Sequence, residues 1–176
     1  MRNIVLCSFL LCILSAGLYP QKATVLYSQK IKHIFSSQKK ADAFSISAYG
    51  QNIFDSYVAF RIVRWDGKEI YKHRFSMGDL MEYGPPETDK AYRRDSKDSS
   101  SIIRHLSHFF DEDQFHNPAI ADTIDMRGNM LPRDKWWNIW KDKTAIGFFY
   151  ELGAEDMHGI VFSKRHKKVI QYYACC

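Results

Sequence analysis

Sequence motifs for phosphate binding and hydrolysis are absent from this chain of 176 residues. It contains neither G-x-G-x-x-G nor a Walker A loop for phosphates, no G-x-S-x-G nucleophile elbow, and no H-E-x-x-H pair for a catalytic metal. The sequence therefore requires no cofactor, and it favours a protein that is not an enzyme.

Cysteine is scarce. Two of the four cysteines, Cys7 and Cys12, lie in an N-terminal apolar run, and the others are the terminal pair Cys175 and Cys176. An internal disulfide framework is excluded, so stability must come from a core, for which 45% hydrophobic and 15% aromatic residues suffice. The terminal pair is a candidate for redox chemistry or cross-linking. The alternative, two thiols on a frayed end, is favoured because vicinal cysteines close only a strained ring.

The apolar run is too short to cross a bilayer, which needs about 20 apolar residues. It spans Ile4 to Leu14, follows Arg2 and precedes Ser15-Ala16-Gly17. A basic start, an apolar stretch and small residues are typical of a secretory signal peptide. We therefore predict a cleaved signal at 1–17 and an exported, periplasmic or secreted, single domain at 18–176 without a transmembrane segment. An uncleaved anchor or a buried helix is the alternative.

No run of basic residues dominates, although the formal net charge is +5 and the pI about 9.0. This balance permits attraction to anionic surfaces. Export argues against nucleic acid, so the expected partner is a protein or a small-molecule ligand.

A β-hairpin is predicted at 56–76, where Asp66-Gly67 fits a two-residue type I′ turn. The register then pairs Val63 with Ile70 and Arg64 with Glu69. One face would be apolar, with His73 as a hydrogen-bonded core histidine; its members are Val58, Phe60, Ile62, Tyr71 and Phe75. A strand at 23–28 and a second at 44–49 precede the hairpin.

The opposite face of the hairpin carries Arg61, Lys72 and Arg74. Arg61 would lie directly across from Lys72, and such a like-charge pair needs water or an anion between its members. We therefore regard these three residues as a candidate binding surface, with a solvated sheet face as the plainer interpretation.

The rest of the chain predicts helices and a meander. Residues 84–98 are charged and read as a polar loop. Apolar spacing predicts an amphipathic helix at 99–114, and Pro132 opens a short aromatic helix at 133–141. Three apolar runs with short loops predict an antiparallel meander at 144–174. The predicted fold class is α+β with mainly antiparallel sheet; an all-β sandwich with peripheral helices is the alternative.

A possible metal site lies on the predicted helix. His105, His108 and Glu112 are spaced i, i+3, i+7, and His116 follows just beyond. Imidazole and carboxylate groups on one helical stripe can hold zinc. A solvated flank of an amphipathic helix explains the same pattern, because His-x-x-His is short and common.

Three tryptophans, Trp136, Trp137 and Trp140, are grouped on the short aromatic helix. Exposed indoles could bind a sugar, a membrane or a partner protein, whereas core packing is their usual role.

These features favour a non-enzymatic envelope or secreted binding protein. Two alternatives stay open: a metal-binding protein or metal-dependent hydrolase using the histidine stripe, and a structural or accessory subunit of an envelope complex.

Overall fold

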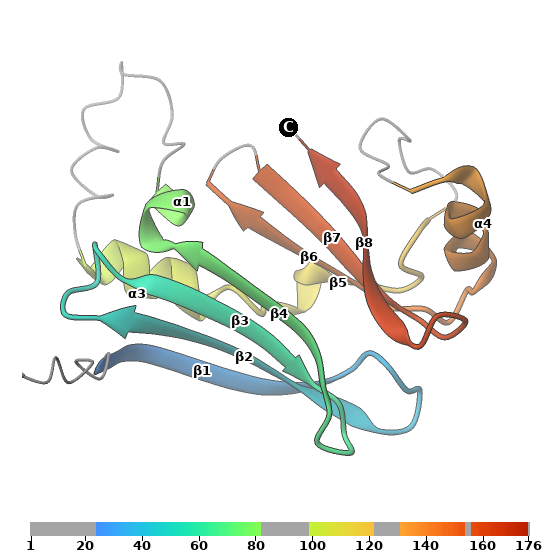
Figure 1. The fold of residues 1–176 in the computed structure, drawn as a ribbon, viewed down its shortest axis with the longest axis horizontal. Helices are drawn as coiled ribbons and strands as arrows, with labels where there is room; N and C mark the ends of the chain where they lie inside the picture. The colour runs from blue at the N-terminus through green and yellow to red at the C-terminus, as the bar shows by residue number, and fades with distance from the viewer. Residues whose placement is uncertain (1–23, 82–98, 122–130, 154–155, 176) are drawn as a thin grey trace, which may run out of the picture.

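The computed structural model describes residues 24–81, 99–121, 131–153 and 156–175, which form two antiparallel four-stranded sheets. The first sheet has the order β1-β2-β3-β4 and the second the order β5-β6-β7-β8 (Figure 1). Strand bounds in the first sheet are β1 Thr24–Ile34, β2 Ala41–Gly50, β3 Tyr57–Val63 and β4 Glu69–Ser76. In the second they are β5 Phe115–His116, β6 Gly147–Leu152, β7 Asp156–Ser163 and β8 Lys168–Cys175.

Short helices lie around the sheets: α1 Met77–Met81, α3 Ser99–Ser107, the 3₁₀ turn η1 Glu112–Gln114 and α4 Arg133–Lys141. The predicted α+β class with mainly antiparallel sheet is confirmed. Within the described ranges, no helix is long and apolar enough to span a membrane.

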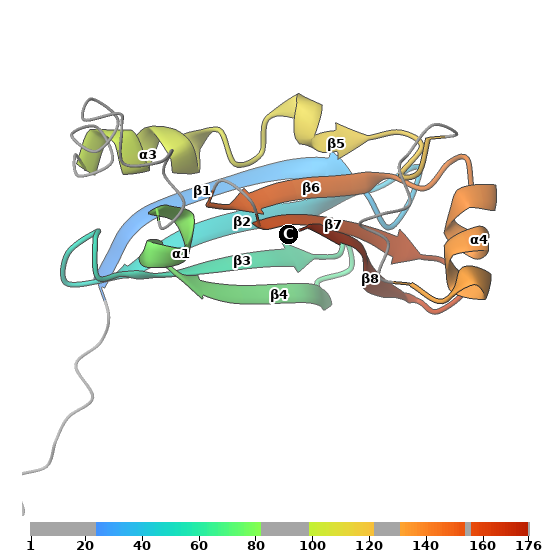
Figure 2. The same ribbon diagram turned by 90° about the horizontal axis from the view of Figure 1, so that it is seen from above.

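The main core lies between the two sheets. Every second residue of β2 and β3 points inward, so that Phe44, Ile46, Phe60 and Ile62 are fully buried. They meet Phe148 and other residues of the second sheet, together with Ile102 and Leu106 of α3. Figure 2 shows α3 and η1 running beside the edge where β1 and β6 lie.

A smaller core lies on the other face of the second sheet. Ile139 of α4 packs there with Ile120, Val161 and Tyr172, and the Tyr172 hydroxyl donates to the Ala119 carbonyl at 2.6 Å. The aromatic helix predicted at 133–141 is confirmed with the same bounds. The molecule thus has three layers, with the second sheet in the middle and α4 outside it.

The hairpin register is confirmed from Val58 to Ile62, but the predicted two-residue turn is wrong. Arg64 N–H donates to Lys68 O, and Gly67 N–H donates to Arg64 O, both at 2.8 Å. The loop therefore has three residues and ends in Gly67 at φ +88°, a type I turn followed by a bulge. On its own, the extra loop residue would shift every cross-strand pair between β3 and β4 by one residue.

A β-bulge at Ile70 restores the register. Val63 pairs with Glu69 and not with Ile70, whereas Ile62 pairs with Tyr71 as predicted. The predicted Arg64–Glu69 pair is consequently wrong. Arg61 Nε donates to Glu69 Oε2 at 2.5 Å, and Arg64 binds Asp66 within the turn. Two one-residue irregularities cancel, which keeps the apolar face intact.

The helix predicted at 99–114 is shorter than expected. α3 ends at Ser107, and η1 begins at Glu112 after turns in which Phe109 N–H donates to Leu106 O and Asp111 N–H to His108 O. A continuous helix would place three carboxylates, from Asp111 to Asp113, at its negative C-terminal end. Starting a new turn at 112 places Glu112 and Asp113 at a positive N-terminal end.

Some predictions fall outside the described residues. The signal peptide at 1–17, the polar loop at 84–98 and Cys176 are among them.

Candidate functional site: an open aromatic cavity on the second sheet

Two glycines shape the outer face of the second sheet. Gly159 on β7 stands between its cross-strand partners Phe149 on β6 and Tyr173 on β8. A Cβ added at Gly159 would lie 2.8 Å from Phe149 Cε1 and 2.8 Å from Tyr173 Cβ. Only glycine leaves room for both aromatic side chains to close over the strand.

The second glycine, Gly147, makes similar room one row away. A Cβ there would lie 2.5 Å from the Tyr172 hydroxyl. His116 pairs with Gly147, so its imidazole projects from the same face and lies 4.5 Å from the Phe149 ring, centroid to centroid. Phe149 is thus flanked by His116 and, at 5.7 Å, by Tyr173.

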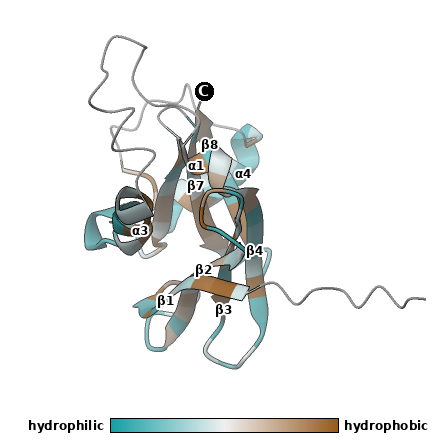
Figure 3. Cartoon of the chain, turned by 90° about the vertical axis from the view of Figure 1, so that its left-hand side faces the viewer, coloured by the Kyte–Doolittle hydropathy of each residue, from teal (hydrophilic) through white to brown (hydrophobic). Residues whose placement is uncertain are grey.

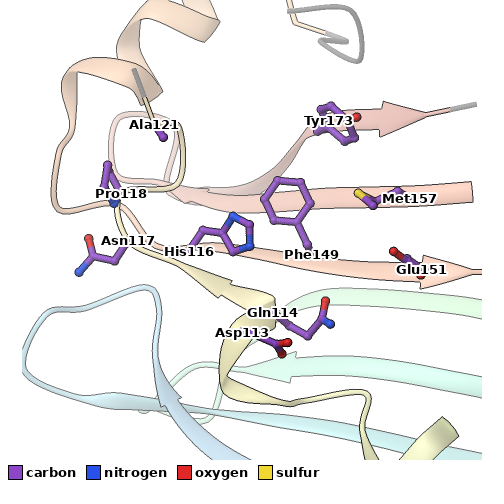
Figure 4. A pocket seen from close by; sticks show the side chains of 10 residues that line it. All are labelled: Asp113, Gln114, His116, Asn117, Pro118, Ala121, Phe149, Glu151, Met157 and Tyr173. Atoms are coloured by element: carbon purple, nitrogen blue, oxygen red, sulfur yellow. The ribbon is translucent and has the colours of Figure 1, made fainter. Parts of the chain in front are cut away.

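These rings form the floor of an open cavity of about 710 Å³. Figure 4 shows Phe149 between His116 and Tyr173, with Met157 and Glu151 farther along the strands. Asp113 and Gln114 of η1, and Asn117, Pro118 and Ala121 after β5, complete the wall. The volume is within the range of about 300–1,000 Å³ that small-molecule sites occupy.

The cavity is lined by apolar and aromatic groups in its floor and by acidic and amide groups in its wall. The floor offers a phenyl ring, a phenol, an imidazole and a thioether, which suit a flat apolar surface. The wall offers the carboxylates of Asp113 and Glu151 and the amides of Gln114 and Asn117. The described lining contains no lysine or arginine. The cavity therefore suits an organic molecule that carries a ring and a cationic or hydrogen-bond-donating group.

A second polar cluster lies where the two sheets meet. The Tyr150 hydroxyl is 2.7 Å from the Tyr71 hydroxyl and 2.9 Å from His73 Nδ1. His73 is hydrogen-bonded as predicted, but it is half-buried and lines a cavity and is therefore not a core residue. Burial raises the pKa of Tyr150 and of Tyr71, and both phenols stay neutral.

Burial also lowers the pKa of His73, and the neighbouring His158 lowers it further, although Asp156 and Asp79 oppose the effect. His158 stacks on Tyr150 with ring centroids 5.0 Å apart. Its Nε2 lies 3.0 Å from Asp156 Oδ1, within ion-pair distance.

A cavity of about 360 Å³ opens beside this cluster. It is lined by Phe75 and two histidines, and it mixes cationic and anionic side chains, Arg74 with Asp79 and Asp156. The cluster's hydrogen bonds join β4 to β6, so its clearest role is to connect the two sheets.

The four residues of the predicted metal site lie in three different surroundings. His105 and His108 line one small pocket of about 120 Å³, where burial lowers the pKa of His105 and His108 Nδ1 lies 2.8 Å from Asp111 Oδ2. Glu112 lies on η1, exposed, and approaches His33 at 3.5 Å. His116 belongs to the aromatic floor. No group of three potential ligands that could hold a metal occurs among the described residues.

The other candidate residues are also separated. Trp136 and Trp140 pack partly buried against the smaller core, whereas Trp137 is 37% exposed. Arg61, Lys72 and Arg74 share the outer face of the first sheet, with Arg61 opposite Lys72 as predicted. Cys175 lies on β8 and is disulfide-bonded, so the favoured prediction of two thiols on a frayed end is wrong for this residue.

Sequence reasoning found one residue of the aromatic cavity, His116, and assigned it a different role. The sequence does not predict that Phe149, Glu151 and Tyr173 line one cavity. Phe149 and Tyr173 are 24 positions apart, and no local pattern shows that residues so far apart are neighbours. The usable signal was Gly159 inside an otherwise apolar strand, since an isolated glycine in a strand marks a close approach.

No protein-family model, curated protein or solved structure matches this chain.

Proposed function

We propose that the protein is a non-enzymatic binding protein whose ligand occupies the aromatic cavity of the second sheet. The ligand is a small organic molecule with a flat ring and an amine or similar cationic group. The observation that carries this proposal is the floor itself: Gly159 is the residue that lets Phe149 and Tyr173 close over β7.

The floor and wall would act on different parts of such a ligand. A ring placed over the floor would bury its own apolar surface and that of the half-exposed Met157 and Tyr173, whereas Phe149 is only 9% exposed and adds little. The carboxylates of Glu151 and Asp113 would attract the cationic group, and the Tyr173 ring adds a cation–π contact. The site contains no nucleophile paired with a base among its described lining residues, which supports binding over catalysis.

The experiment is a screen of small aromatic amines and matched neutral ring compounds by thermal shift, followed by calorimetry. A ligand of the cavity should raise the melting temperature in proportion to its concentration. The amines should bind about tenfold more tightly than the neutral compounds, since one charge–charge contact in a partly shielded site is worth about 1–2 kcal/mol.

Neutralising the wall provides the matched test. Glu151→Gln and Asp113→Asn should weaken amine binding and leave binding of the neutral ring unchanged. Glu112→Gln is the control, because Glu112 sits beside Asp113 on η1 but does not line the cavity. Equal losses in the control and in Asp113→Asn would place the ligand elsewhere.

Export is the second part of the proposal, and it rests on the layout of residues 1–17. Mass spectrometry of the envelope or secreted fraction should find a chain that begins between residues 16 and 24. An intact Met1 in a cytosolic pool would contradict it.

A further inference from the structure

The outer face of the first sheet carries an ordered pattern of charge. Its members follow from the strand register: directly paired residues share a face, and every second residue along a strand returns to it. One row across the sheet reads Lys30, Ser45, Arg61 and Lys72. The row on one side reads Lys32, Ala43, Val63 and Glu69, and that on the other reads Ser28, Ser47, Ala59 and Arg74.

This face is cationic, because its five basic side chains outnumber its acids. Five basic side chains of the face are exposed: Lys30, Lys32, Arg61, Lys72 and Arg74. Among its described residues the face has one acid, Glu69, which is bound to Arg61. Arg61 and Lys72 lie directly opposite each other, and Glu69 offsets part of their repulsion, which leaves the face with a net positive charge.

The cations are spread in two dimensions. Lys30 on β1 and Lys72 on β4 are three strands apart, roughly 14 Å, and small residues lie between them on β2. A two-dimensional array matches a plane of anionic groups better than a single polymer strand.

Apolar residues bound the array at both ends of the sheet. Val25, 54% exposed, precedes the basic rows on β1 of the same face, and its row continues into the stacked pair Tyr49 and Tyr57. Ile34, 40% exposed, ends β1 beyond Lys32. The neighbouring loops add Phe54 at the Val25 end and Trp65 at the Ile34 end.

A cationic centre between apolar and aromatic ends is the arrangement that suits a lipid surface, where cations meet phosphates and aromatic rings lie among the headgroups. Among the described segments, none covers this face: Figure 3 places β1, β2 and β3 at the lower edge of the molecule, with α3, α4 and the second sheet above them. We infer that the outer face of the first sheet docks onto the surface of an anionic lipid bilayer. The inference is independent of the ligand cavity, which lies on the opposite side of the second sheet.

Vesicle sedimentation tests this directly. The protein is purified as it is recovered from the cells that express it. It is then mixed with phosphatidylcholine vesicles that either contain or lack phosphatidylglycerol. It should sediment with the anionic vesicles, not with the neutral ones, and binding should fall as salt is raised.

Two variants with the same change in formal charge separate the face from overall charge. Lys30→Glu/Lys72→Glu should weaken vesicle binding about tenfold or more. Lys135→Glu/Lys141→Glu, on exposed positions of α4 on the other side of the molecule, should retain it within about twofold of the wild type. Denaturant melts of both variants show that each is folded.

A third variant tests the apolar ends. Val25→Ser/Ile34→Ser should reduce the binding that persists at high salt, since that part comes from apolar contact. Equal losses in the two charge variants would overturn the proposal. So would retention on heparin without vesicle binding, because the face would then bind soluble polyanions.

Discussion

Asp42 illustrates how one residue can organise a sheet. It is fully buried on β2, and its carboxylate accepts hydrogen bonds from Ser36 N–H at 2.6 Å and Ser36 Oγ at 3.0 Å. It also accepts one at 3.0 Å from Trp65 N–H in the β3–β4 loop. A buried carboxylate is tolerated only when such donors surround it, so Asp42 connects two turns that are distant in sequence.

Replacing Asp42 should therefore be costly. Asp42→Ala leaves the donors of Ser36 and Trp65 without their acceptor and should lower the free energy of unfolding by about 2–4 kcal/mol. Asp42→Asn keeps one acceptor oxygen and should lower it less. Urea melts give both values, with the exposed Asp113→Ala as a control expected within about 0.5 kcal/mol of the wild type. A loss for Asp42→Ala as small as the control's would show that these bonds contribute little.

His73 and His105 should make stability depend on pH. Burial lowers the pKa of both below the ordinary 6.5, so the unfolded chain binds protons more readily than the folded one. Well above pH 6.5, both histidines are neutral in the folded and in the unfolded chain, so they add no pH dependence to the stability. As the pH falls below 6.5, the unfolded state gains protons first, and the melting temperature should fall.

The double variant His73→Gln/His105→Gln removes both titrating groups. It should show a smaller drop in melting temperature between pH 7.5 and pH 5, even though its melting temperature at pH 7.5 is lower because the Tyr150 hydroxyl loses its partner His73. Scanning calorimetry at several pH values measures both quantities. Parallel curves for variant and wild type would contradict this assignment.

At the scale of elements, the hairpin shows how a correct register can follow from an incorrect turn. Alternation of apolar residues in β3 predicts its inward face, because the burial of Val58, Phe60 and Ile62 dominates the energetics. The length of the turn is predicted wrongly because Asp-Gly fits both a two-residue type I′ turn and the last two positions of a three-residue loop. The bulge at Ile70, a compensation four residues away, has no local sequence signal.

Gly67 is required by this turn. Its φ of +88° lies in the left-handed region, and a Cβ there would meet no atom within 4 Å, so any cost of substitution comes from the backbone alone. Gly67→Val should lower the free energy of unfolding by about 1–2 kcal/mol, and Gly67→Asn by less, because asparagine tolerates this region. Denaturant melts distinguish the two. Equal losses would show that the left-handed backbone conformation does not decide the cost of substitution.

The helices show the same division between local and distant causes. The bounds of α4 follow from Pro132 and the aromatic pattern after it, both of which are local. α3 ends early because of the acidic run after it, a local signal that apolar spacing alone overlooks. β5 has only two residues and exists because Phe115 and His116 meet β6, so no short-range pattern could reveal it.

At the scale of the whole molecule, the sequence predicts strands and the hairpin and meander within each sheet, but not how the sheets face each other. Local turns specify neighbouring strands, whereas the contact between Phe60 and Phe148 joins residues far apart in the chain. The aromatic cavity belongs to the same class, since its floor depends on three strands and on the segment after η1. Residue patterns identified His116 but could not supply its neighbours.

The shared core implies that the two sheets unfold together. Ile62 on β3 is fully buried in a cluster that includes Phe148 and Ile160 of the second sheet. Ile62→Ala should therefore lower the free energy of unfolding of the entire chain by about 2–4 kcal/mol.

Three of the four tryptophans lie on α4 against the second sheet, and the other is Trp65 in the β3–β4 loop. In a Trp65→Phe background, tryptophan fluorescence reports on α4 alone, while circular dichroism reports on the strands of both sheets. The substitution in the first sheet should shift both transitions by the same amount, although Ile62 and α4 lie in different layers. A shift seen only by circular dichroism would mean that the sheets are separate cooperative units and that the main core couples them weakly.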